Sequence, residues 1–569
     1  MPCRFSTHQR RSNFEMGFLS DFFRNPDQIS WYNPLGWPYT EEQIKADPTL
    51  DPYYDPPGWV PSRARVFFSV FWESIRKPPG ERRYVQKLDR GLLFYLMFSY
   101  MIKSLDQKNI SNAYVSGMKE DLNLDGNEYN YFTTLFNCGY LVGSVPAQWS
   151  LRFVRPSLMI PAMECTWTIF VMLLSRATSA RYIYIFRFFQ GMAESICYPT
   201  MMMILGSWYK PDEIAKRVVI WDMSWNLASM FSGYIQAGVY TNLDGINGLA
   251  GWQWLFIVDG CISLPVALTG LYAIPDFPTT TKARWLSERD IAYSIRRMKE
   301  VGKKGTRKMT VRRFIQIFTG WRFWSFLLPY SLYIVGAGDY MNLWLEDIGY
   351  SVQMTNILPT IGSAVALVSG YILAIISDIT LWRWQIAMAA LVPYVFGNLV
   401  LAIWDVPFGL KFAANIIPYI GSSFFSQFMA WISEIFQDDT ELRGFLPAIG
   451  NTLWYCNYAW FPVVAFPASK APHYPWGYWA AFGLAIANMV TIYTCRMAHM
   501  WDVKRRGLVK NKFGMYVERE DLVEYLEDEP SLTSRDVKLT GVVEAVHELD
   551  SSNYDIEKNM HHRTSIAKP

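Results

Sequence analysis

Charged residues and cysteine motifs are both scarce in this chain, and each shortage excludes a class of protein. Lysine, arginine, aspartate and glutamate make up only 18% of the 569 residues, against about 25% in an average soluble domain. The seven cysteines show no Cys-x-x-Cys spacing, which argues against a zinc site and a disulfide framework. A formal net charge of +3 is too small to indicate a nucleic-acid partner.

Histidine is also rare, and its placement argues against an enzyme. None of the six histidines falls in a cluster with acids or a nucleophile inside the apolar part of the chain. A membrane-embedded hydrolase or metalloenzyme would need such a cluster. The sequence therefore predicts neither catalysis nor a metal site.

Long apolar blocks fill the middle of the chain. A helix needs about 20 apolar residues to cross the hydrocarbon core of a bilayer. The sequence therefore predicts an all-α membrane protein with twelve transmembrane helices in two six-helix bundles. The twelve blocks are Gly91–Ser111, Tyr129–Leu151, Leu158–Leu174, Ile183–Leu205, Val218–Tyr240, Trp252–Ile274, Phe323–Leu345, Ile357–Ile376, Trp384–Ile403, Phe412–Ile435, Phe445–Phe466 and Trp476–Tyr493.

Basic clusters set the predicted orientation. No apolar run long enough for a cleavable signal peptide precedes the first block, so that block is expected to direct insertion. Lysine and arginine gather before the first block, between the sixth and seventh, and after the last. All three clusters share the cytoplasmic side only if each half has an even number of spans. Two loops do not follow this charge rule: one places Arg176 and Arg181 on the outer side, and the other places acids on the inner side, namely Asp438, Asp439 and Glu441.

The resulting domain prediction places both termini in the cytoplasm. Within the linker, Ser287-Glu288-Arg289-Asp290 is typical of a capping box that opens an amphipathic helix ending near Val301. That helix could lie on anionic headgroups or tether the two bundles. The predicted parts are a tail over 1–88, a first bundle over 89–276, the linker over 277–321, a second bundle over 322–500 and a tail over 501–569.

Polar side chains inside the apolar blocks are the candidate functional residues, because an ionisable group is costly at membrane depth. In the first block, Lys103, Asp106 and Gln107 are spaced i, i+3, i+4 and share one helix face. That face is predicted to meet an aqueous cavity or a partner helix. Buried ion pairs or helix-packing hydrogen bonds are the structural alternative.

The fourth block carries a polar stripe formed by Arg187, Gln190, Gly191, Glu194 and Tyr198 at i, i+3, i+4, i+7 and i+11. Burial disfavours a carboxylate, so Glu194 can take up and release a proton. Arg187 stays charged, and its planar fork matches a carboxylate. The pair therefore suits a proton-coupled anion carrier. A permanent Arg187–Glu194 ion pair is the alternative, although two helical turns separate the residues.

The seventh block holds Asp339 and Asn342 at i, i+3, the same relation as Asp106 and Asn109 in the first block. We interpret this match as a weak trace of internal repetition between the halves. Further polar residues in the blocks are candidates for substrate binding or interhelical hydrogen bonds. Those that we assign to the substrate region are Lys103, Gln107, Asn109, Asn137, Gln190, Tyr198, Tyr333, Asp339, Asn342 and Tyr419.

Several of these segments resemble a known family. The run from Leu105 to Leu122, LDQKNISNAYVSGMKEDL, is similar to fungal major facilitator carriers of the anion:cation symporter group. So are Arg187-Phe188-Phe189-Gln190-Gly191 with Glu194, and Gly251-Trp252-Gln253-Trp254-Leu255-Phe256. The resemblance spans about 87–514 and is closest to the pantothenate and vitamin H (biotin) branch.

The resemblance implies alternating access and uptake of a monocarboxylate with protons, driven by the proton gradient without a cofactor. It implies proton handling by Asp106 and Glu194 and a substrate-facing Arg187. Gln107 stands where many relatives carry Arg or Lys, which leaves the first-helix cation that meets the substrate undefined. Gating roles are implied for Arg152, Arg155, Asp378 and Arg383.

We therefore expect a monomeric plasma-membrane importer of a small organic monocarboxylate, with pantothenate first. Uptake of biotin, nicotinate or an allantoate-type acid, and efflux of a secondary metabolite, are alternatives within transport. A nutrient sensor that keeps the helices but moves no solute is the alternative from a different class.

Overall fold

The computed structural model describes residues 72–151, 153–300, 311–333, 336, 338–436 and 440–507, with a few isolated positions on either side. The chain divides into two compact units, 1–497 and 498–569. The second unit contains the end of the last helix and a two-stranded antiparallel sheet. Its strands are β1 (Val509–Lys510) and β2 (Tyr516–Val517).

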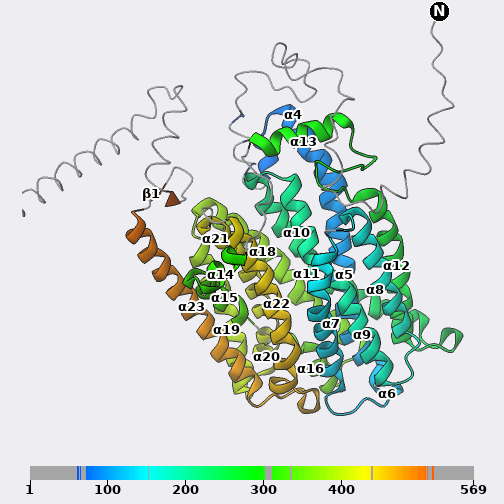
Figure 1. Cartoon of the computed structure of the whole chain (residues 1–569). Coiled ribbons are helices and arrows are strands. Elements are labelled where there is room, and N and C mark those ends of the chain that lie inside the picture. The colour runs from blue at the N-terminus through cyan, green and yellow to red at the C-terminus, as the bar shows by residue number, and fades with distance from the viewer. Residues whose placement is uncertain are drawn as a thin grey trace, which may run out of the picture. The chain divides into compact units, whose positions relative to one another are not determined.

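The first half of the larger unit is helical throughout its described residues, apart from short connections (Figure 1). Its helices pack mainly in the pairs α5 with α11, α7 with α9 and α8 with α12. Their bounds are η3 Glu73–Arg76, α4 Pro79–Leu88, η4 Asp89–Leu93, α5 Phe94–Ala113, η5 Tyr114–Met118, α6 Lys119–Asp121, α7 Glu128–Ser150, α8 Pro156–Leu174, α9 Ala180–Glu194, α10 Cys197–Trp208, α11 Pro211–Leu243, η6 Ile246–Gly248 and α12 Gly251–Ala273.

The second half follows the linker helix α13 (Glu288–Glu300) and meets the first half through α11 with α18 and α7 with α22. Its helices are α14 Val311–Thr319, α15 Trp321–Leu332, α16 Met341–Asp347, α17 Val352–Ile357, α18 Thr360–Thr380, α19 Arg383–Ile403, α20 Phe408–Ile416, η7 Ile417–Ser423, α21 Phe424–Ile435, α22 Thr440–Ala465, η8 Ala468–Lys470 and α23 Gly477–Arg506.

Helices cover each of the twelve predicted blocks, but not every block is one apolar helix. Large apolar side chains such as Phe94, Val145, Leu268 and Val368 are exposed, as expected for surfaces that face lipid. Five helices among the described residues are long and apolar enough by themselves to cross a bilayer: Pro156–Leu174, Gly251–Ala273, Val352–Thr380, Arg383–Ile403 and Gly477–Arg506.

The prediction of one continuous helix over Phe323–Leu345 is wrong. α15 ends at Leu332, and α16 begins only at Met341. The chain turns between them at Gly338, whose φ of +95° favours glycine and whose position leaves no room for a Cβ beside the Tyr419 ring. Asp339 lies in this turn and not one helical turn before Asn342. The predicted likeness to Asp106 and Asn109, which both lie in α5, therefore fails.

Two other blocks are also interrupted. The fourth block breaks after Glu194, where α9 ends, and resumes in α10 at Cys197, so Tyr198 does not continue the α9 stripe. The tenth block passes through the 3-10 segment η7 between α20 and α21.

Glycines let α7 and α9 pack with their backbones in close contact. A Cβ on Gly139 would collide with the carbonyl oxygen of Phe188, and one on Gly191 would collide with that of Phe136. A Cβ on Gly143 would lie 2.8 Å from the Cα of Met192. Small residues at such contacts are typical of membrane helix pairs. Gly191, a member of the polar stripe, therefore has a packing role, and this contact holds the stripe in place.

The linker helix α13 lies against the first half, beside α4 (Figure 1). Its predicted capping box is present, because the Asp290 backbone N–H donates to the Ser287 hydroxyl at 3.3 Å and the Ser287 N–H donates to the Asp290 carboxylate at 2.8 Å. Asp290 also pairs with Lys87 at 2.5 Å. The polar face of α13 is thus buried against protein, at least along Asp290 and Arg297.

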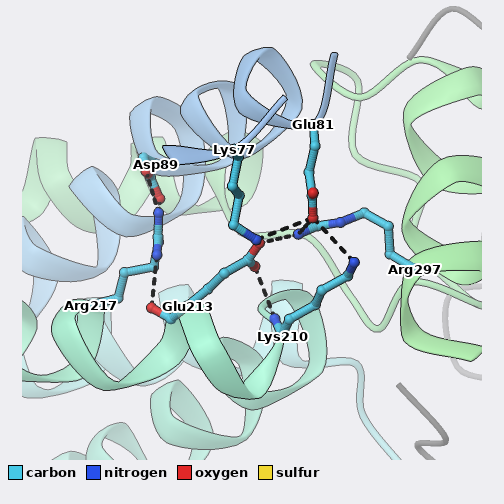
Figure 2. A network of polar contacts seen from close by, with 7 residues as sticks. All are labelled: Lys77, Glu81, Asp89, Lys210, Glu213, Arg217 and Arg297. Carbon is cyan, nitrogen blue, oxygen red and sulfur yellow. Dashed lines mark hydrogen bonds and ion pairs between the residues drawn. The ribbon is translucent and has the colours of Figure 1, made fainter. Parts of the chain in front are cut away.

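Figure 2 shows an ion network that joins α4, α11 and α13. Fully buried Glu213 accepts from Lys77 and Arg297, while Glu81 pairs with Arg297 at 3.1 Å and with Lys210 at 3.2 Å.

Within this network, Glu81 stays ionised at physiological pH. Burial alone would raise the pKa of Glu81, but the positive charges of Lys77, Arg297 and Lys210 lower it to about 2. A carboxyl whose pKa falls on folding contributes stability above its ordinary pKa of 4.5 and loses that contribution as the pH falls toward 2. Glu81 therefore does not change its charge in the pH range in which transport is measured.

We predict that Gly139→Ala destabilises the protein by about 1–3 kcal/mol, because the added methyl overpacks the α7–α9 contact. The control is Gly238→Ala in α11, where a Cβ has no neighbour within 4 Å and alanine favours the helix. Thermal melting of purified protein in detergent measures both. Equal melting temperatures for the two variants would contradict the packing assignment.

We also predict that Glu213→Gln lowers the melting temperature, because three cations then share the single carboxylate of Glu81. Breaking a buried ion pair typically costs about 3–5 kcal/mol. Glu120→Gln, which changes an exposed acid, serves as the control. A Glu213→Gln protein as stable as this control would show that the network contributes nothing.

Candidate functional site

The polar stripe on α9 forms a hydrogen-bonded line inside the protein. The Arg187 Nη1 donates to Gln190 Oε1 at 3.1 Å, and Gln190 Nε2 donates to Glu194 Oε1 at 2.8 Å. All three side chains are at least 98% buried, with exposed fractions of 2%, 0% and 0%. Gln190 therefore bridges the arginine and the acid, which do not form the direct ion pair considered as an alternative.

Arg187 keeps donor capacity to spare. Its guanidinium lies over the Phe136 ring, 4.6 Å from the centroid, and its Nε has no hydrogen-bond partner among the described residues. A buried guanidinium with an unfilled donor is costly, and a carboxylate is the group that best fills it. Arg187 therefore has a free Nε–H donor, among the described residues, that an anionic ligand could fill.

The three polar residues of the first block contact three different elements. Gln107 Nε2 donates to Glu194 Oε2 at 2.7 Å, and Lys103 Nζ donates to Tyr455 Oη of α22 at 3.3 Å. Asp106 turns instead toward α12, where its side chain interacts with that of Asp259. The face therefore meets partner helices, the second of its two predicted surroundings, and Asp106 does not face Arg187 across a void.

A cluster of aromatic rings surrounds Lys103. Its Nζ lies 5.3 Å from the Tyr100 ring centroid, 6.0 Å from that of Tyr140 and 5.8 Å from that of Trp225. Tyr140 in turn stacks on Tyr455 at 3.6 Å, joining α7 to α22. Such rings stabilise a buried cation without neutralising it. Lys103 also lies close enough to Glu194 to interact with it electrostatically.

Lys108 and Asp339 bring charges of opposite sign from the two halves together. Lys108 is half-buried, lies 5.6 Å from the Trp225 ring centroid and interacts electrostatically with Asp339. Asp339 is exposed, although Tyr333 and Tyr419 lie close enough to interact with it. The Asp339 carboxylate also accepts from the Gly336 N–H at 3.0 Å.

The remaining predicted substrate residues lie in several places. Asn342 of α16 donates to Asn112 of α5 at 3.1 Å, linking the halves. Asn109 donates to Asp259 at 2.5 Å, away from Arg187. Asn137 of α7 is 3% exposed, and its amide nitrogen has no hydrogen-bond partner in the described part of the chain. Tyr198 is half-buried, 5.2 Å from the ring of Trp221.

Tyr333 and Tyr419 border the break in the seventh block. The Tyr419 hydroxyl donates to the Gly338 carbonyl at 3.3 Å, and the Tyr333 ring lies 5.1 Å from that of Tyr394. Both tyrosines therefore help to hold the turn that presents Asp339.

Of the four predicted gating residues, two form an ion pair. Arg383 contacts Asp378 at 2.5 Å and also pairs with Glu434 of α21 at 3.4 Å, an acid that the sequence did not single out. Arg155 precedes α8 and interacts electrostatically with Asp276. Arg152 lies outside the described residues.

Two buried acids near the site were not singled out from the sequence. Glu164 of α8 accepts from Tyr95 at 2.7 Å and from Ser99, and Asp259 of α12 accepts from Asn109. Each is an acid inside an apolar block, which was the available signal, but neither belongs to a periodic polar pattern. Asp222 of α11, one of the further polar residues that the sequence offers as candidates, is half-buried and interacts electrostatically with Lys103.

The two halves are joined at one end by polar contacts. Asn130 Nδ2 donates to the carbonyl oxygen of Phe466 at 2.9 Å, and Asn356 Nδ2 donates to the Ser116 hydroxyl at 3.0 Å. In the predicted orientation this end is extracellular. These contacts hold the two halves together at that end.

Comparison with known proteins identifies the family. The model for the Major Facilitator Superfamily matches residues 96–462. The chain is 32% identical to MFS transporter PfmaC of Pestalotiopsis fici, over 74% of this chain and 81% of that protein. It is 31% identical to pantothenate transporter liz1 of Schizosaccharomyces pombe, over 74% of this chain and 82% of that protein.

A solved structure shares the fold. The proton:xylose symporter XylE bound to 6-bromo-6-deoxy-D-glucose superposes with a TM-score of 0.56 at 14% identity, covering 71% of this chain and 96% of that one. This likeness confirms the predicted major facilitator fold. The family model covers more than half of the chain and the relatives are named as transporters, so this chain is a membrane transporter that belongs to the Major Facilitator Superfamily.

Proposed function

We propose that this transporter imports a small organic monocarboxylate together with protons across the plasma membrane, with pantothenate as the first candidate. The observation that carries the proposal is the buried line from Arg187 through Gln190 to Glu194. It joins a cation with an unfilled donor to an acid that can hold a proton. The name of the relative liz1 supports pantothenate as the substrate.

Charge balance explains why substrate and proton would move together. A carboxylate that docks on Arg187 brings a negative charge into a region of low dielectric, where uncompensated charge is expensive. A proton bound at Glu194 offsets that charge, and Gln190 contacts both sites. The loaded centre then has the same net charge as the empty one, so both can pass through the bilayer-spanning region.

The surrounding side chains suit a polar acid. Lys103 lies near Glu194, Lys108 lies over the Trp225 ring, and Asn137 offers an amide nitrogen without a partner among the described residues. Pantothenate carries hydroxyl and amide groups besides its carboxylate, which such donors and acceptors can satisfy. We assign Tyr198, Tyr333 and Tyr419 to the walls of this region.

The same proposal includes the arrangement in the membrane. Two six-helix bundles over 89–276 and 322–500 would rock about the stripe, with both termini in the cytoplasm and the protein acting as a monomer. The contacts of Asp378 and Arg383 would open and close with that movement. Efflux of a secondary metabolite uses the same parts, since gradients set the direction of a secondary carrier. Uptake of biotin remains the second candidate within import.

We predict that cells expressing the protein take up labelled pantothenate several-fold faster at pH 5 than at pH 7, because protons drive the uptake. A protonophore is expected to abolish accumulation at pH 5. Unlabelled biotin, nicotinate and allantoate, added as competitors, rank the alternative substrates. If uptake changes with neither pH nor the protonophore, transport is not coupled to protons. If the protein reaches the cell surface normally but no uptake is measured, the sensor hypothesis is favoured.

Arg187→Gln is expected to raise the KM for the acid roughly tenfold or more, because the substrate loses a charge-assisted hydrogen bond. Arg181→Gln is the matched control, since Arg181 lies on the same helix and is exposed. An unchanged KM in Arg187→Gln would exclude Arg187 as the carboxylate site.

Glu194→Gln is expected to abolish accumulation against a gradient while exchange of labelled for unlabelled substrate continues. A glutamine keeps the shape of the side chain and can accept one of the two amide hydrogen bonds through its single oxygen, but it cannot release a proton. Counterflow in proteoliposomes measures the exchange. Loss of both activities in a well-folded variant would mean that Glu194 is structural.

A further inference from the structure

Asp106 and Asp259 form a pair of buried acids that no ion pair neutralises in the described part of the chain. They come from α5 and α12, are 1% and 0% exposed, and interact through their side chains. Neither oxygen of Asp106 accepts a hydrogen bond from another described residue, and Asp259 Oδ1 accepts none either. Asp259 is therefore the main polar partner of Asp106, while Asp259 itself also accepts from Asn109 at 2.5 Å.

The elements around the pair supply few compensating charges. From α9, Glu194 and Arg187 act on Asp106 over a longer range, one of each sign. From α8, the Trp167 indole lies beside Asp106, while Glu164 of the same helix is occupied by Tyr95 and Ser99. From α11, the neutral Ser232 contacts Asn109, and Asp222 of that helix interacts with Lys103. From α12 itself, the neutral Ser263 interacts with Asp259.

Two adjacent carboxylates cannot both stay ionised in such a place. Burial makes each charge expensive, and a like charge next to it adds repulsion that low dielectric strengthens. One shared proton removes the repulsion and supplies the missing donor between the two groups. The pair therefore holds at least one proton when the centre is buried as it is here.

Hydrogen bonds indicate which acid is charged. Asn109 Nδ2 donates to Asp259 Oδ2 at 2.5 Å, and the Ser232 hydroxyl donates to Asn109 Oδ1 at 2.6 Å. Asn112 Nδ2 donates to Ser232 at 2.6 Å, and Asn342 Nδ2 of α16 donates to Asn112 Oδ1 at 3.1 Å. Every donor in this chain points toward Asp259, which suits a carboxylate there and a protonated Asp106 beside it.

We infer that Asp259, unassigned by the sequence, shares a transported proton with Asp106, and that the chain of amides to Asn342 links this proton site to the second half of the carrier. The inference rests on the proposed proton-coupled import. A second proton on the pair would neutralise the Asp259 carboxylate and make it a weaker acceptor at the end of the chain. The contact of Asn112 with Asn342 would then weaken, which couples protonation to the end where the halves are joined.

The test uses the full-length protein in proteoliposomes, with Asp259→Asn compared with wild type. Asp276→Asn is the matched control, a buried aspartate just beyond α12 that accepts from the Ser157 N–H at 3.1 Å. We expect Asp259→Asn to retain pantothenate exchange within about twofold of wild type. Proton-driven accumulation should fall at least tenfold, with Asp276→Asn unaffected. The double variant with Asp106→Asn should be no worse than either single variant, because the pair acts as one site.

Intact accumulation in Asp259→Asn would overturn the inference and leave the proposed import standing. Absence of any proton-driven accumulation in wild type would instead refute the proposed function. A second variant, Asn109→Ala, decides the matter if Asp259→Asn does not fold. Losing a donor to the Asp259 carboxylate should make the pair hold its proton more tightly, which raises the pH of half-maximal uptake by about one unit. An unshifted pH profile would overturn the inference as well.

Discussion

A charge buried at membrane depth must find a partner, a proton or a ligand, and that constraint organises the polar centre of this transporter. Arg187 is covered by an aromatic ring and one amide, with a donor left over. Glu194 accepts from two amides and faces Lys103 without a direct ion pair. The charges of this centre are therefore only partly compensated. In the proposed mechanism, the substrate anion and the proton complete the compensation, and these are the species that the carrier transports.

Outside the transmembrane spans, by contrast, buried charges are paired with one another. Around Glu213 and Glu81, several cations and two carboxylates neutralise one another in permanent ion pairs that attach α13 to the first half. With their charges paired in this way, these groups have a structural role. Fully paired charges outside the spans thus stabilise the fold, whereas the incompletely paired charges inside the spans are those to which we assign the transport mechanism.

Much of the fold could be predicted because it depends on local patterns. Apolar blocks locate the helices, the capping box at Ser287 locates α13, and the spacing from Arg187 to Glu194 predicts a polar line. The break at Gly338 could not be predicted, because it depends on the Tyr419 ring that packs there from elsewhere in the chain. Asp259 was missed for a related reason: a single acid in an apolar block reveals its role only when the fold places Asp106 beside it.

The claim at the centre of this account is that Arg187 is the counter-ion of the transported acid. An experimental structure of the protein with pantothenate bound in a lipid bilayer tests it most directly. The account predicts the substrate carboxylate within hydrogen-bonding distance of the Arg187 guanidinium, with Gln190 still bridging to Glu194. A substrate carboxylate bound by other residues, with the ring of Phe136 still covering an unliganded Arg187, would contradict it.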